Sequence, residues 1–146
     1  MKTFIFGILC AFLSAASAGN SSQCNRVADV KGTPVRAGKI VIVVEKQTPL
    51  LSFAANELQG FLTKAAGEKP EMADTPLADG IALILGDNSY SRFAGLDVSC
   101  LPADGYFIRR IGNRIYLLGR DSATADPNAP KWAELYSRGT LNAVYD

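Results

Sequence analysis

Two apolar strands separated by one amphipathic helix constrain this chain more than any other feature of its sequence. Residues 49–66 place seven apolar side chains at intervals that form one stripe of a 3.6-residue helix: Leu51, Ala54, Ala55, Leu58, Phe61, Leu62 and Ala65. Thr48 and Pro49 are typical of a helix start, and Gly67 is typical of a left-handed helix end. The helix is therefore predicted to lie with one face on a sheet and the other in water.

The flanking runs predict strands buried on both faces. Residues 40–44 are a continuous β-branched run, and residues 81–85 are apolar throughout. Such runs are typical of central strands with a layer on each side. Strand, helix and strand in this order form a right-handed crossover, so the two strands are expected to be parallel. A short edge strand is expected near Glu71 and Met72.

The second half of the chain predicts a hairpin and a helix. Residues 105–111 and 114–118 flank Gly112-Asn113, a tight turn in which both residues tolerate positive φ. Leu141, Val144 and Tyr145 have helical spacing, in a helix that the sequence leaves incomplete. Residues 89–103 and the loop 121–136 are expected to be irregular. The predicted fold class for residues 38–146 is α/β, a mixed β-sheet with helices packed on it.

The first eighteen residues have the pattern of a signal peptide. Lys2 precedes an apolar run at residues 4–13, and Ala16-Ser17-Ala18 matches the small-residue cleavage pattern. The run is shorter than the roughly 20 residues that a bilayer span needs. Cleavage after Ala18 predicts a secreted or periplasmic protein with no membrane contact afterwards. Residues 19–37 are small and polar and predict a flexible lead.

Charge and composition exclude several classes of function. Removing Lys2 with the signal peptide leaves 14 basic and 14 acidic residues, so no basic surface for nucleic acid is expected. The chain has no histidine, which excludes His-based triads and His-ligated zinc. No Gly-rich phosphate loop joins a strand to a helix. We therefore predict no cofactor and no metal.

Two cysteines remain after signal cleavage, Cys24 and Cys100. In an oxidising compartment they could pair and tie the lead to the loop before the hairpin. The sequence does not show whether their Cα atoms lie within bonding distance, so both the paired and the free state of these cysteines stay open as predictions.

Two carboxylates, those of Asp87 and Asp121, directly follow the ends of predicted strands. Glycoside hydrolases cleave a glycosidic bond with two carboxyl groups that flank it. Their neighbours are Asn and Ser residues, which favours turns in which Asp caps its own backbone. We assign no catalytic residue to this chain.

The loop 121–136 and the residues after it contain candidate substrate-binding side chains. Trp132 and Tyr136 could stack on a sugar ring, although a lone tryptophan more often anchors a loop to the protein body. Arg138 could hold an acidic sugar in a bidentate grip, or cover the start of the second helix. Trp132 and Arg138 are thus the candidate substrate-binding residues, with a structural role as the competing interpretation.

Several strings resemble the N-terminal domain that precedes the catalytic barrel of secreted glycoside hydrolases. They occupy residues 53–59 and 61–67 of the helix, 84–86, 104–108, 113–117 and, most specifically, 138–146 (RGTLNAVYD). The chain is most similar to the alpha-glucuronidase type (family 67), and more distantly to the beta-hexosaminidase N-terminal domain. Residues 122–137 depart from this pattern, because in that family the hairpin leads almost directly to the Arg-Gly-Thr turn.

The resemblance implies a sandwich-like accessory domain, truncated before a downstream (β/α)8 barrel that hydrolyses O-glycosyl bonds. The barrel would carry the catalytic residues, and this chain alone would not be an enzyme. The implied partners are that barrel and, less directly, a polysaccharide. The alternative from another class is a stand-alone or cell-surface glycan-binding module that uses the loop 121–136.

Overall fold

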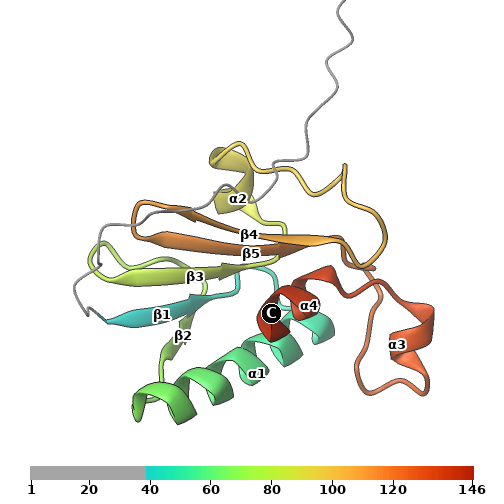
Figure 1. Ribbon diagram of the computed structural model, residues 1–146, viewed down its shortest axis with the longest axis horizontal. Helices are drawn as coiled ribbons and strands as arrows, with labels where there is room; N and C mark the ends of the chain where they lie inside the picture. The colour runs from blue at the N-terminus through green and yellow to red at the C-terminus, as the bar shows by residue number, and fades with distance from the viewer. Residues whose placement is uncertain (1–38) are drawn as a thin grey trace, which may run out of the picture.

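The computed structural model describes residues 39–146, apart from the side chains of Trp132 and Ala133. The predicted signal peptide and lead lie outside the described residues. Five strands form one mixed sheet with helices on both faces, which confirms the predicted α/β fold (Figure 1). The elements are β1 (Ile40–Val43), α1 (Pro49–Ala66), β2 (Glu71–Ala73), β3 (Ile81–Leu85), α2 (Ser89–Phe93), β4 (Tyr106–Ile111), β5 (Arg114–Gly119), α3 (Trp132–Leu135) and α4 (Gly139–Tyr145).

The strand order is β2-β1-β3-β5-β4. The pairs β1–β2, β1–β3 and β3–β5 are parallel, and β4 runs antiparallel to β5. The crossover, the short edge strand and the hairpin are therefore confirmed. Of the two turn residues only Gly112 has positive φ, at 61°. A turn with glycine at its first central position matches the twist of a hairpin.

The central strands are buried on both faces, as their apolar runs predict. Ile42, Leu83 and Leu117 face α1 and α4 in one core. Val41, Ile84 and Tyr116 face the opposite core. Alternate residues of a strand point to opposite faces, so one continuous apolar run supplies both cores.

Helix α1 begins and ends where its sequence predicts. The Thr48 side chain accepts from the Leu51 N–H at 3.2 Å, Pro49 is in the first turn, and Gly67 has a left-handed φ of 77°. The predicted apolar stripe is wrong over its last turns, because Phe61 is 42% exposed and Ala65 is exposed. The Phe61 ring lies edge-on to Tyr145 of α4, with centroids 6.1 Å apart, and does not lie under the sheet.

The prediction of an irregular segment at residues 89–103 is wrong for its first five residues and holds for the rest. The segment begins with α2, and two of its leucines, Leu96 and Leu101, are buried in the second core. Asn88 starts the helix: its side chain accepts from the Ser91 N–H at 2.9 Å, and the Ser91 hydroxyl accepts from the Asn88 N–H at 3.0 Å. This reciprocal capping box stabilises a five-residue helix that its length alone would leave marginal.

The loop 121–136 also contains a helix that the sequence did not predict, the single turn α3. Its two ends are joined: the Ser122 N–H donates to the Ser137 carbonyl, and the Ser137 N–H donates to the Ser122 hydroxyl, both at 2.8 Å. Figure 1 shows the loop with α3 standing away from the sheet beyond α4. The predicted second helix is confirmed as α4, which buries Leu141, Ala143 and Val144.

Candidate functional site: a cleft at the carboxyl edge of the sheet

Three parallel strands, β1, β3 and β5, end at the same edge of the sheet. Helix α1, which follows β1, packs on one face of the sheet. Helix α2, which follows β3, packs on the other face, because the two helices belong to different cores. Ligands of α/β sheets bind in the crevice that such diverging connections leave at the carboxyl ends of the strands. A cleft of about 370 Å³ lies here, lined by Lys46, Thr48, Leu51, Asp87, Asp97, Val98, Ser99, Gly119, Arg120, Asp121, Ser122 and Ala123.

Both carboxylates that the sequence singles out, Asp87 and Asp121, line this one cleft. They follow β3 and β5, which are neighbours in the sheet. The cleft also brings together residues that no sequence pattern singled out, among them Lys46, Asp97 and Arg120. Their only sequence signal is that Lys46 and Arg120 closely follow strand ends, a position that many surface residues share.

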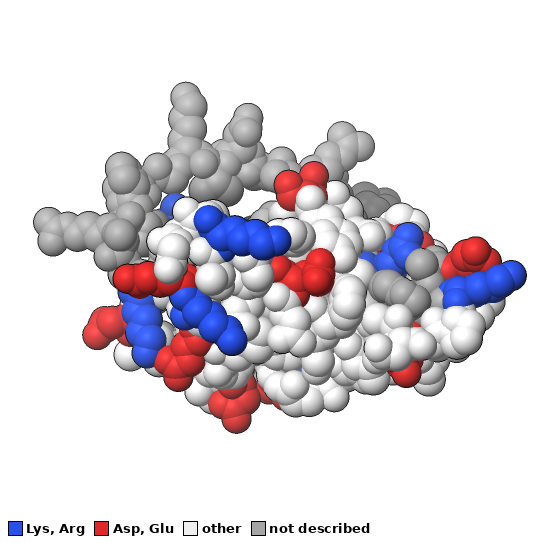
Figure 2. Space-filling view, turned by 90° about the horizontal axis from the view of Figure 1, so that it is seen from below, with Lys and Arg blue, Asp and Glu red and all other residues white. Residues whose placement is uncertain are grey.

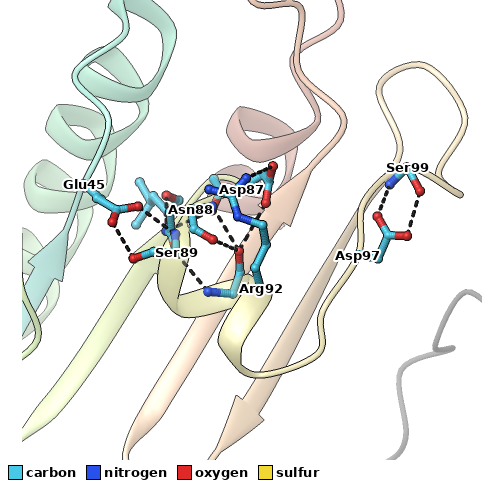
Figure 3. Close-up of polar contacts among 10 residues, drawn as sticks. Glu45, Asp87, Asn88, Ser89, Arg92, Asp97 and Ser99 are labelled. Atoms are coloured by element: carbon cyan, nitrogen blue, oxygen red, sulfur yellow. Dashed lines mark hydrogen bonds and ion pairs between the residues drawn. The ribbon is translucent and has the colours of Figure 1, made fainter.

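A bridge between β1 and α2 lies next to the cleft. The carboxylate of Glu45 accepts hydrogen bonds from the backbone N–H of Ser89, at 2.7 Å, and from the Ser89 hydroxyl (Figure 3). The hydroxyl and then the N–H of Ser89 lower the pKa of Glu45 below its usual value, because both bonds favour the ionised carboxylate. Glu45 therefore fastens the start of α2 to the end of β1.

Asp87 is bound to the helix that follows it. Its carboxylate lies 3.4 Å from Arg92 Nη1 and 3.4 Å from the Ser91 hydroxyl (Figure 3). The expectation that Asp87 caps its own turn is wrong, because the neighbouring Asn88 supplies the cap. Asp87 instead pairs with the last turn of α2.

Asp121 holds the start of α4. Its two oxygens accept from Thr140, one from the backbone N–H at 2.8 Å and the other from the hydroxyl at 2.6 Å. The expectation of a local turn is therefore wrong here too, since the partner is 19 residues away. Burial raises the pKa of Asp121 above its usual 3.8, and nearby Asp104 raises it further, whereas the bonds from Thr140 oppose the shift.

A second carboxylate binds the same helix start. Asp104 Oδ1 accepts from the Arg138 N–H at 2.6 Å, and the Asp104 carbonyl accepts from the Asn142 side chain at 3.2 Å. Residues 121 and 138 also pair through an isolated antiparallel bridge. Carboxylates are favourable at helix N-termini, where backbone N–H groups lack partners. The Arg138 backbone thus lies at the start of α4 and is held there by Asp104.

Asp97 and Arg120, which also line the cleft, are each held by hydrogen bonds. Asp97 accepts from the Ser99 N–H at 2.8 Å and from its hydroxyl at 2.7 Å, and the hydroxyl followed by the N–H lowers the pKa of Asp97 (Figure 3). Arg120 Nη1 donates to the Leu101 carbonyl at 2.8 Å. That bond fastens the segment after α2 across the end of β5.

Among the described side chains, Tyr136, Arg138 and Cys100 do not line this cleft. Trp132 lies in α3, but its side chain is outside the described residues, so stacking on a sugar stays a prediction. Tyr136 is partly buried against the first core, and stacking of its ring on a sugar stays a prediction. Cys100 is exposed near Asp97, and its proposed partner Cys24 lies outside the described residues.

A larger hollow, of about 710 Å³, lies between the end of α1 and β2. Its lining is mainly the α1–β2 connection, and its charged residues include Lys39 and Glu71, which form an ion pair at 2.5 Å. We favour the smaller cleft as the candidate site, because polar side chains from four separate segments converge there.

Two comparisons of this sequence with known proteins give no match, so they assign no function to this site. No protein-family model matches the chain, and no curated protein matches its sequence. Within residues 39–146 no three acidic or thiol side chains are grouped as a metal site. No helix in the same range is long and apolar enough to cross a membrane.

Proposed function

We propose that this chain is a non-catalytic accessory domain of a secreted glycoside hydrolase, of the alpha-glucuronidase type, that supports a downstream catalytic barrel. One observation carries the non-catalytic part of this proposal. Asp121 is bound to Thr140, and Asp87 is bound to Arg92 and Ser91. Glycosidic cleavage needs one carboxyl group as acid and one as base or nucleophile at the scissile bond. Two carboxylates that hold helices in place suit a structural role better.

The face formed by α1 and α4 supports the proposed role toward a second domain. Phe61 is 42% and Tyr145 is 53% exposed, and the two rings are in contact. In Figure 2, which views this side, charged side chains are most numerous toward the two ends and fewer lie between them. The Tyr145 hydroxyl donates to Glu57 at 3.3 Å. Exposed aromatic rings in contact with each other are typical of surfaces that other domains cover.

The test is made on the protein as its host secretes it. The intact mass should exceed that of this chain several-fold, and the double variant Asp87→Asn/Asp121→Asn should keep kcat within about twofold, with any loss of activity appearing as a higher KM. Asp79→Asn, on the exposed turn before β3, is the matched control. A loss of activity above 100-fold with an unchanged melting temperature would make these carboxylates catalytic. An intact mass equal to that of the mature chain would refute the accessory role.

The glycan-binding module is the second candidate, and the projecting loop favours it. Leu135 of α3 is 67% exposed, and the loop stands away from the sheet (Figure 1). In this case Trp132→Ala should abolish binding to a polysaccharide column without lowering the melting temperature. Arg138→Ala should weaken binding only if that side chain also contacts the glycan. Unchanged retention of Trp132→Ala excludes stacking by Trp132.

A further inference from the structure

The carboxyl-edge cleft is a hollow whose lining is suited to a small neutral ligand. Its volume of about 370 Å³ is near the lower end of the range for ligand pockets, roughly 300–1,000 Å³. Leu51 and Val98 give it apolar surface, whereas Thr48, Ser99 and Ser122 add hydroxyl groups. A ligand with both a C–H face and hydroxyl groups matches this mixture.

Charge in the lining restricts the ligand further. Three carboxylates, of Asp87, Asp97 and Asp121, stand against two cations, of Lys46 and Arg120. The carboxylates disfavour an anion, and the two cations disfavour a metal ion. A neutral molecule avoids both penalties.

Hydrogen-bonding capacity is left over in the cleft. An ionised carboxylate has about four acceptor positions. Asp121 and Asp97 each use two of them for Thr140 and Ser99 respectively. Lys46 is exposed, and its ammonium makes no hydrogen bond or ion pair within the described part of the chain. Adjacent hydroxyl groups of a ligand can donate to the carboxylates and accept from the lysine.

We infer that this cleft binds one neutral, hydroxyl-rich ring, a monosaccharide unit, without cleaving it. The choice of a sugar among polyols rests on the proposed function. The cleft would then hold one residue of the polysaccharide while another domain cleaves it. Ala123, exposed on the rim, is the position at which the cleft can be filled.

The experiment is saturation-transfer NMR on the secreted protein with the methyl glycosides of D-glucose, D-xylose, D-galactose and D-mannose at millimolar concentration. Ala123→Trp should abolish the transfer signal of the sugar that binds. Ala66→Trp is the matched control, because Ala66 is also exposed but lines the other hollow. Lys46→Ala should weaken binding roughly tenfold through loss of one charged hydrogen bond, and tests the cleft independently of any misfolding caused by tryptophan.

Absence of binding by all four glycosides overturns the inference. So does binding that only Ala66→Trp abolishes, or that neither tryptophan nor Lys46→Ala changes. Loss of binding in Ala123→Trp and Lys46→Ala, in a protein without glycosidase activity, would leave the cleft assigned and refute the proposed enzyme. Glycosidase activity in a protein whose cleft binds no sugar would support the proposed enzyme and refute the inference about the cleft.

Discussion

At the scale of single residues, one hydroxyl group connects the start of α4 to the end of β5. The Thr140 side chain is fully buried, donates to Asp121 and accepts from the Gly119 N–H at 3.1 Å. Close contact here requires glycine, because a Cβ on Gly119 would lie 2.0 Å from the Gly139 carbonyl carbon. The start of α4 is thus held directly against the end of β5.

Replacing Thr140 by valine tests this arrangement. The change keeps the shape but leaves the Gly119 N–H without its acceptor and Asp121 without one donor, so the free energy of unfolding should fall by about 2 kcal/mol. Urea denaturation measures it. Thr63→Val is the control: its hydroxyl donates to the Gln59 carbonyl within α1, and its loss should change stability by less than about 0.5 kcal/mol. Equal effects would show that Thr140 is not special.

Asp121 predicts a pH dependence with a definite sign. Its pKa is raised in the folded protein, so between its ordinary 3.8 and the raised value the folded state binds more protons than the unfolded state. Its contribution to stability therefore falls as pH rises through that window. Glu45 and Asp97, with lowered pKa values, contribute stability that is lost as pH falls.

The subtraction of two unfolding curves isolates Asp121. Asp121→Asn keeps an acceptor for the Thr140 N–H but does not titrate, and the contributions of Glu45 and Asp97 cancel. The stability of the variant relative to wild type should rise from pH 4 upward and then level off. A relative stability that falls with pH would mean that the hydrogen bonds from Thr140 outweigh burial.

At the scale of elements, the loop that carries α3 is closed at its base. Ser122 and Ser137 exchange two hydrogen bonds, and residues 121 and 138 form a bridge. Ala125 and Tyr136, next to the base, are the loop residues that reach the first core. The rest of the loop contributes little to the fold.

Replacing residues 126–135 by a four-residue Gly/Ser linker should therefore keep the fold. We expect an unchanged circular dichroism spectrum and a change in unfolding free energy within about 1 kcal/mol, because loop-closure entropy depends weakly on length. The same linker in place of residues 96–101 is the contrast, since it removes two buried leucines worth about 2–5 kcal/mol each. If the first excision unfolds the protein, the loop packs more tightly than its exposure indicates.

At the scale of the whole molecule, the central strands serve two cores. Ile42 and Ile84 are both completely buried, but they lie on opposite faces of neighbouring strands. Helices α1 and α4 cover one face, and α2 with the segment after it covers the other (Figure 1). Neither face is exposed to solvent at the centre of the sheet.

Ile42→Ala and Ile84→Ala should therefore destabilise the protein to a similar extent, by about 2–5 kcal/mol each in guanidinium denaturation. Ile40→Ala is the control, because this residue at the start of β1 is only partly buried and should cost less. A small effect of Ile84→Ala alone would mean that the covering on the α2 face is loose.

The sequence predicted those parts of the fold that depend on residues close together in the chain. The apolar runs of β1 and β3, the caps of α1 and the Gly112-Asn113 turn all act within a few residues. Leu96 and Leu101 were missed because isolated leucines in a polar segment have no period. The bond from Asp121 to Thr140 joins positions 19 apart, and the cleft joins four segments, so neither leaves a local signal.

Strand β4 lies at one edge of the sheet, and this position affects whether the protein aggregates at high concentration. Within residues 39–146 no strand pairs with the outer edge of β4, and an edge strand of six residues can pair with a second molecule and so propagate into filaments. Arg109 and Arg110 are the fourth and fifth of its six residues. In an antiparallel pairing centred between them, each would face an arginine of the other copy, and like charges directly opposite destabilise a sheet. The two arginines thus counteract growth of the sheet from molecule to molecule.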